Sequence, residues 1–149
     1  MARVYLSTTL GIAYTNDHPV GTGCPNHRDD VQLVQFFLKT VSEGPRKDQF
    51  TPSGQKPLIC DGLWGISSQA YLDKFLFSIA SVVSSARLKQ DGRVDPVRGG
   101  KVIGSVSRTV YTILALNAAY RASRGASAST DITTDPLFPS ELLPSLKLP

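Results

Sequence analysis

Residues 61–75 constrain the fold of this chain more than any other segment, because two turn signals lead directly into a helical pattern. Asp61 and Gly62 form a turn pair, in which the carboxylate can accept backbone hydrogen bonds and the glycine can take a positive φ. Gly65 allows a second backbone reversal directly after Trp64. The segment therefore predicts a tight double turn that holds the indole and starts a helix.

That helix is predicted to be long and amphipathic. Ser67 or Ser68 can accept hydrogen bonds from the unpaired amides of the first turn, which places the N-cap there. Apolar residues then recur at spacings of three and four, as expected for one buried helix face. The residues of this face are Leu72, Phe75, Leu76, Ile79, Val82 and Val83. We predict that the helix ends near Arg87.

An earlier helix is predicted over residues 30–41. Asp29 or Asp30 can cap it, and both carboxylates favour the positive end of its macrodipole. Its apolar residues also repeat at helical spacing, and they are Val31, Val34, Phe37, Leu38 and Val41. Gly44 and the proline that follows are expected to end this helix.

A third helix is predicted after a glycine-rich stretch, in which Asp91 and Gly92 repeat the turn chemistry of the central segment. Ser105 or Ser107 can cap this helix, which is expected to end near Ser123. The residues that share its buried face are Val106, Val110, Ile113, Leu114, Asn117 and Tyr120.

The two ends of the chain differ from this helical centre. Between Arg3 and Tyr14, partly alternating apolar residues predict one or two short strands, with Gly11 at a bend. The residues after Arg124 combine four prolines with several leucines. Prolines at this density forbid a long helix, and the leucines argue against simple solvation. We expect an extended strap over an apolar groove, either on its own domain or on a partner.

These elements predict a mainly α fold, with three helices around one core, short N-terminal strands and an extended, proline-rich C-terminal tail. The expected boundaries are a strand segment over residues 1–19, the helical domain over 20–123 and the tail over 124–149. A chain of 149 residues is long enough to bury one core of this kind.

Composition and charge exclude several classes of protein. No apolar run approaches the roughly 18 residues that a membrane span needs, so no transmembrane helix is predicted. The N-terminus lacks the hydrophobic segment and the cleavage site of a secretory signal, so we expect a protein made in the cytoplasm. The net charge is +4, but Lys and Arg are scattered along the chain. Nucleic-acid binding is therefore not predicted.

The cysteines and histidines offer little evidence for a disulfide framework or a metal site. Cys24 and Cys60 can form one disulfide or remain as two buried thiols. Together with His18 and His27 they are a set of ligands that zinc accepts in tetrahedral geometry. Their spacing, however, matches no compact zinc-finger pattern. We expect no metal and no other cofactor.

No pattern in the sequence points to catalysis. Ser7, Ser53 and Ser67 lie in no nucleophile-elbow motif, and a catalytic triad is visible only in a fold. Carboxylates such as Asp61 and Glu43 could pair as they do in glycosidases, but turns and caps explain them equally well. We expect no catalytic residue and a protein that is not an enzyme.

Two segments of the chain resemble the peptidoglycan-binding-like domain, a three-helix module attached to many bacterial and phage cell-wall hydrolases. The first segment carries the family's glycine-rich approach and first helix in Val20, Gly21, Gly23, Asn26, Asp30, Val31, Leu33, Val34, Gln35 and Leu38. The second carries its Asp, Gly, x, aromatic, Gly turn and following helix in Asp61, Gly62, Trp64, Gly65, Ser68, Leu72 and Phe75. The resemblance covers residues 20–120.

A further segment is similar to the terminal helix of a subgroup found in phage lysis cassettes and near contractile secretion systems. Its residues are Asp91, Gly92, Arg93, Val94, Asp95, Pro96, Arg108, Thr109, Leu114 and Asn117, with an insertion over 97–107. Three positions depart from the family pattern. Ser68 replaces the usual Thr, Tyr71 replaces a small residue, and Leu76 stands where a Gln commonly follows the Phe.

The resemblance implies a shallow binding groove beside the second turn, and the residues that it assigns to ligand binding are Asp61, Gly62, Trp64, Gly65, Ser68, Gln69 and Gln35. Backbone and polar side chains would bond amide and hydroxyl groups, while Trp64 packs on an apolar sugar face. The alternative is structural. Asp61 then only ties its turn, Ser68 caps a helix, Trp64 belongs to the core and Gln35 bonds a loop carbonyl.

The function that the resemblance implies is non-catalytic binding of peptidoglycan, a muropeptide or a related envelope component. Such a module would target a partner hydrolase or effector at the cell envelope, in a secreted particle or in a virion. The alternative is a structural or adaptor component of a phage particle or contractile secretion assembly. In that case, the chain would dock through the segment between Arg3 and Tyr14 and the segment between Asp135 and Pro149. For the assembly state, a homo-oligomer is a further alternative. For the function, a small cell-wall hydrolase is a third alternative, and it is disfavoured.

Overall fold

The computed structural model describes residues 3–7, 11–80, 87–88, 91–97 and 109–146. This part of the chain is mainly α-helical, which confirms the predicted fold class at that level. Its helices are α1 (Arg28–Ser42), α2 (Lys47–Phe50), α3 (Ile66–Ala80), α4 (Thr112–Arg124), α5 (Ala126–Thr130) and two 3-10 helices, η1 (Ile132–Thr134) and η2 (Ser140–Ser145). Its strands are β1 (Arg3–Ser7), β2 (Gly11–Thr15), β3 (Val20–Gly21), β4 (Arg87–Leu88), β5 (Arg93–Val94) and β6 (Thr109–Val110).

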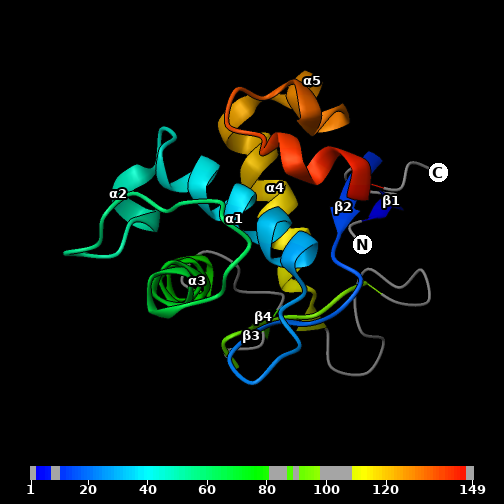
Figure 1. Cartoon of the computed structure of the whole chain (residues 1–149). Coiled ribbons are helices and arrows are strands. Elements are labelled where there is room, and N and C mark those ends of the chain that lie inside the picture. The colour runs from blue at the N-terminus through cyan, green and yellow to red at the C-terminus, as the bar shows by residue number, and fades with distance from the viewer. Residues whose placement is uncertain (1–2, 8–10, 81–86, 89–90, 98–108, 147–149) are drawn as a thin grey trace.

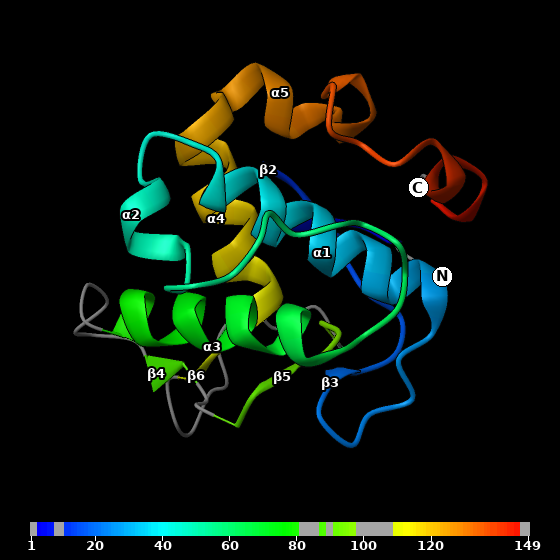
Figure 2. The same cartoon turned by 60° about the vertical axis from the view of Figure 1, so that its left-hand side comes forward.

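Helix α1 lies in the middle of the molecule and contacts α2, α3, α4 and η2 (Figure 2). Nearly every side chain along α1 is buried, so the helix is surrounded rather than half-exposed. The Phe36 ring lies 5.5 Å from the rings of both Tyr120 in α4 and Phe138 in the tail. Aromatic pairs at this distance contribute about 0.5–1.5 kcal/mol each beyond their buried area. This cluster joins the first helix, the last long helix and the tail.

The first predicted helix is confirmed, but its predicted cap is wrong. Helix α1 begins at Arg28 after its N-cap residue His27, whose side chain makes no capping hydrogen bond. Asp30 lies inside the first turn, where it is fully buried. Its carboxylate accepts hydrogen bonds from the backbone N–H groups of Asp17 at 2.8 Å and His18 at 3.1 Å. Asp30 therefore anchors the preceding loop, and a carboxylate used in this way cannot cap the helix.

Helix α3 begins at Ile66, so neither of the serines predicted as caps lies before it. Its described part ends at Ala80, and Val82 and Val83 lie outside the described residues. Arg87, near which the helix was predicted to end, lies in β4, which pairs in parallel with β6, and residues 81–86 lie outside the described residues. A helical period cannot reveal a pairing with residues that lie 22 positions further along the chain.

Helix α4 confirms the third predicted helix and most of its predicted face. Ile113, Leu114, Asn117 and Tyr120 are all buried. Val110 belongs to β6 and not to the helix, while the caps predicted at Ser105 and Ser107 lie outside the described residues. The helix begins at Thr112 and ends at Arg124.

The predicted N-terminal strands are confirmed as an antiparallel pair, β1 and β2, in which Arg3 lies opposite Thr15. Asn117 of α4 both donates a hydrogen bond to the backbone of β2 and accepts one from it, as a residue of a neighbouring strand does. Its side-chain oxygen accepts from the Tyr14 backbone N–H at 2.8 Å, and its amide nitrogen donates to the Tyr14 carbonyl at 2.8 Å. Asn117 therefore fixes β2 to α4, and Figure 1 shows the strand pair beside the helical core.

The tail is not extended, because α5, η1 and η2 divide it into short helical segments. Proline does not prevent this, since each helical segment is only a turn or two long. Ile132 and Leu142 are fully buried in the same core as α1, so the tail packs on its own domain. No helix in the described part of the chain is long and apolar enough to cross a membrane.

Candidate ligand-binding site

The turn before α3 has the geometry predicted for its first half. The Asp61 carboxylate accepts from the Leu63 backbone N–H at 2.9 Å, and Gly62 has a φ of +78°. A Cβ at Gly62 would lie 2.5 Å from Cγ of Arg28, so only glycine fits there. Gly65 differs from the prediction. Its φ lies outside the left-handed region, and an added Cβ would meet no atom within 4 Å, so the second reversal does not require glycine.

Gln35 connects α1 to this turn through its side-chain amide. The two hydrogens of its nitrogen have three acceptors within reach: the Asp61 carboxylate at 3.2 Å, the Leu63 carbonyl at 2.9 Å and the Ser68 hydroxyl at 3.0 Å. Its oxygen accepts from the Gly62 backbone N–H at 2.9 Å. Gln35 and Ser68 are both buried, and Gln35 bonds a loop carbonyl as the structural alternative predicts. These two residues hold the turn in place.

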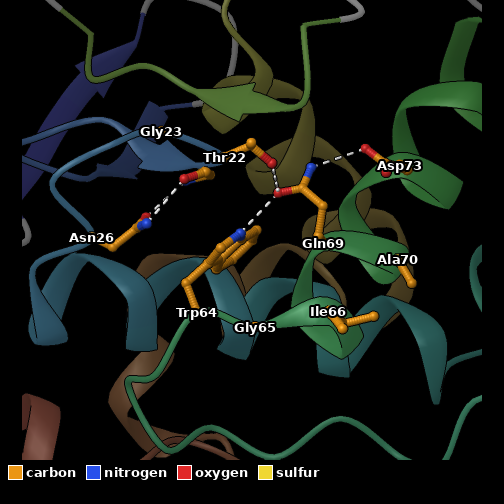
Figure 3. Close-up of a pocket in the computed structure, with 10 residues that line it drawn as sticks. Thr22, Gly23, Asn26, Trp64, Gly65, Ile66, Gln69, Ala70 and Asp73 are labelled. Atoms are coloured by element: carbon orange, nitrogen blue, oxygen red, sulfur yellow. Dashed lines mark hydrogen bonds between the residues drawn. The ribbon is translucent and has the colours of Figure 1, made fainter.

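Gln69 connects the indole to two other segments. Its side-chain oxygen accepts from Trp64 Nε1 at 2.8 Å and from the Thr22 hydroxyl at 2.9 Å. Its nitrogen donates to the Asp73 carboxylate at 3.0 Å and to the Gly92 carbonyl at 3.1 Å. Figure 3 shows Trp64 and Thr22 directed at the same Gln69 oxygen from opposite sides. The indole is thereby fixed in one orientation, half-buried beside α3.

A pocket of about 590 Å³ lies between the start of α3 and the loop after β3. It is lined by Gly21, Thr22, Gly23, Asn26, Trp64, Gly65, Ile66, Gln69, Ala70 and Asp73 (Figure 3). We call it the Trp64 pocket. Asn26 fixes its loop wall, since its side chain accepts from the Gly21 N–H at 2.8 Å and donates to the Gly21 carbonyl at 2.9 Å. The pocket therefore has a preformed shape with an aromatic wall and polar edges.

A second hollow of about 400 Å³ lies on the other side of the same turn. Its lining residues are Lys56, Pro57, Leu58, Ile59, Asp61, Leu63, Trp64, Gly65, Ile66, Ser67 and Ser68. Ile59, Leu63 and Ile66 are 70%, 67% and 89% exposed. These three apolar residues form a surface that we call the turn patch.

The structure brings some of the predicted site residues together and separates others. Trp64 and Gly65 line both hollows, Gln69 lines the Trp64 pocket, and Asp61 and Ser68 line the second hollow. Gln35 and Gly62 line neither hollow. Residues that the sequence analysis did not assign to the site are Thr22, Asn26, Ile66 and Asp73. The spacing of Asp73, four residues after Gln69 on one helix, is a signal that could have identified it.

Neither thiol forms a disulfide, and both are half-buried. Burial raises the pKa of the Cys60 thiol from its usual 9.0 to about 12. The His18 and His27 rings stack at 4.2 Å, remote in sequence from Cys60. Among the described residues, no three His, Cys, Asp or Glu side chains lie close enough together to hold a metal ion.

Comparisons with protein-family models, with curated proteins and with solved structures found no match to this chain. The resemblance to the peptidoglycan-binding-like domain therefore depends on the residues and motifs of the sequence alone.

Proposed function

We propose that this chain is a peptidoglycan-binding-like module, with α1, α3 and α4 around one core, that binds peptidoglycan or a related envelope component without cleaving it. It would concentrate a partner hydrolase or effector on that polymer, at the cell envelope, in a secreted particle or in a virion. The observation that carries the proposal is the Trp64 pocket. It lies beside the turn to which the resemblance assigns ligand binding, and the indole forms one of its walls.

The chemistry of the pocket supports this ligand class. An oriented indole presents an apolar face on which a sugar ring or an aliphatic side chain can pack. Around it, the Thr22 hydroxyl, the Asn26 amide and the Asp73 carboxylate provide donors and acceptors for amides and hydroxyls. A few fixed polar groups around an apolar wall are typical of sites that bind small polar ligands.

Retention on purified, insoluble peptidoglycan tests the proposal. The Trp64→Ala variant should lose most of the retention that the unmodified chain shows. Phe77→Ala is a matched control, because Phe77 is a 72% exposed aromatic residue on the same helix and lines neither hollow. Circular dichroism must show that both variants are folded. Absence of retention in the unmodified chain contradicts the proposal, and release of soluble muropeptides would indicate a hydrolase instead.

A second candidate function is that of an adaptor in a multiprotein assembly, and the turn patch favours it. Three exposed apolar residues around one hollow are more than isolated surface residues, and such clusters occur at protein interfaces. The variant Ile59→Ser with Leu63→Ser should then abolish self-association or partner binding in sedimentation experiments. If it leaves the assembly state unchanged while peptidoglycan retention persists, the adaptor function is contradicted.

A further inference from the structure

The charge of the Trp64 pocket differs in sign from that of the whole chain. The chain carries a net charge of +4, yet the pocket's lone charged lining residue among those described is Asp73. A carboxylate at the wall of an open pocket repels anions and attracts cations. The pocket therefore favours a ligand group with a positive charge.

Asp73 is available to such a group. One of its oxygens accepts from the Gln69 side-chain nitrogen at 3.0 Å, which fixes the orientation of the carboxylate. Its other oxygen accepts no hydrogen bond from any residue that the structure describes. Lys74, the next residue in the sequence, and Arg93, the residue after Gly92, both contact other groups. Lys74 Nζ lies 6.0 Å from the centre of the Phe77 ring, and Arg93 lies 3.9 Å from Asp95.

The other walls of the pocket suit a short aliphatic chain that ends in a cation. Trp64, Ile66 and Ala70 provide apolar surface in the same pocket, with Gln69 between the indole and the Asp73 carboxylate (Figure 3). An indole attracts an ammonium group through the negative face of its ring, more strongly than other aromatic side chains do. A carboxylate and an indole in one pocket thus provide both the charge and the packing that an alkylammonium group needs.

We propose that the Trp64 pocket binds a primary ammonium group at the end of a short aliphatic chain, with Asp73 as its ion-pair partner. This inference rests on the proposed function. It deepens that function by naming the part of the polymer that enters the pocket. The acetylated sugars of peptidoglycan carry no cation, whereas the diamino acid of its stem peptide carries a side-chain amine. The pocket would therefore select the peptide rather than the glycan.

Trp64 is the only tryptophan in the chain, so selectively excited tryptophan fluorescence reports on this pocket alone. The probe is the synthetic tripeptide Ala-γ-Glu-Lys, blocked at its α-amine and carrying a free lysine amine. The comparison peptide is the same molecule with the lysine amine acetylated. The two differ only in the charge and hydrogens of that nitrogen and in one acetyl group.

We expect the free-amine peptide to bind at least about fivefold more tightly than the acetylated peptide, the size of one partly exposed charged contact. The Asp73→Asn variant should remove this preference, because the amide still accepts from Gln69 but carries no charge. Asp48→Asn should keep it. Asp48 is an exposed carboxylate in α2, outside the pocket, so this variant changes the net charge equally.

Parallel retention on insoluble peptidoglycan separates the two proposals. Equal binding of both peptides, or an unchanged preference in Asp73→Asn, overturns the ammonium site, even where retention on the polymer persists. A third outcome is that Asp73→Asn loses the preference while the unmodified chain is not retained on the polymer. This outcome supports the ammonium site and contradicts peptidoglycan as the source of the ammonium group. If neither peptide changes the fluorescence, the ammonium site is also overturned.

Discussion

The side-chain oxygen of Gln35 and the backbone N–H of Gly62 form a hydrogen bond of 2.9 Å, although the two residues lie 27 positions apart in the sequence. The same side chain donates to the Leu63 carbonyl and to the Ser68 hydroxyl. One buried amide of α1 therefore determines where the turn lies and where α3 begins. Because that turn carries Trp64, the position of the pocket depends on α1.

Replacing Gln35 with leucine should lower the free energy of unfolding by about 2–4 kcal/mol, because it leaves the Gly62 N–H and the Ser68 hydroxyl buried without this partner. Urea denaturation followed by circular dichroism measures the change. Gln55→Leu, in an exposed loop, is the matched control and should change stability by less than about 0.5 kcal/mol. A loss of similar size in both variants would show that the hydrogen bonds of Gln35 do not fix the turn.

The Tyr120 hydroxyl donates to the Asp135 carboxylate at 2.9 Å, and Arg124 Nε lies 3.1 Å from the same carboxylate oxygen. This network attaches the tail to α4. We expect Tyr120→Phe to cost about 1–2 kcal/mol, since it removes one hydrogen bond to a buried charged group and keeps the ring. Urea denaturation at neutral pH measures the cost. An unchanged free energy of unfolding would mean that Arg124 alone satisfies the carboxylate.

The stability of the chain should fall in alkaline solution. Burial, above all, raises the pKa of Tyr14, Tyr71 and Tyr120 above the usual 10.0, so the folded chain holds the phenolic protons more tightly than the unfolded chain. The contribution of these three groups to the free energy of unfolding is fully present below pH 10 and decreases as the pH rises above it. Urea midpoints measured against pH test this. The decline should be shallower in Tyr120→Phe, and an equal slope would contradict the contribution of Tyr120.

The helical elements were largely predictable because their signals are local. In α4, Ile113, Leu114, Asn117 and Tyr120 occur at helical spacing, and the same four side chains are buried. In α1, the apolar period predicted the helix although the helix is surrounded on nearly all sides. The cap was missed because Asp30 bonds the backbone of a loop 12 and 13 residues away. A carboxylate near the start of a helix has the same sequence signature whether it caps the helix or bonds a distant loop.

The remaining features depend on contacts between distant segments. Strand β3 pairs with β5, with Val20 opposite Val94. This pairing places the loop that contains Thr22 next to the start of α3. No periodicity in either segment indicates the partner, so the second wall of the Trp64 pocket could not be predicted. Of the residues predicted to bind a ligand, Trp64, Gly65 and Gln69 therefore line the turn side of the pocket, and none lines the loop side. Their role in ligand binding stays a prediction. Gln35 was assigned to the site through the family resemblance, with a bond to a loop carbonyl as the alternative, and its bond to the Leu63 carbonyl agrees with that alternative.

The two thiols should differ in reactivity. Burial raises the pKa of Cys60 to about 12, so only roughly one molecule in ten thousand carries the reactive thiolate at about pH 8. Cys24 lies in the loop before α1. We expect iodoacetamide to modify Cys24 first and Cys60 at a comparable rate only in urea. Mass spectrometry of the tryptic peptides measures both rates, with Cys24→Ser as the control. Equal rates in the folded chain would contradict the burial of Cys60.

Leu142 and Leu143 are neighbours in the tail, yet the first is fully buried and the second is 55% exposed. This contrast tests whether the tail packs on its own domain in solution. Leu142→Ala should lower the free energy of unfolding by about 2–5 kcal/mol, because it leaves a cavity in the core shared with α1. Leu143→Ala should change it by less than about 1 kcal/mol, since its side chain already contacts water. Urea denaturation of the isolated chain compares the two variants directly. If both leave stability unchanged, the tail is not part of the core of the free protein, and a partner would have to provide the surface on which its leucines pack.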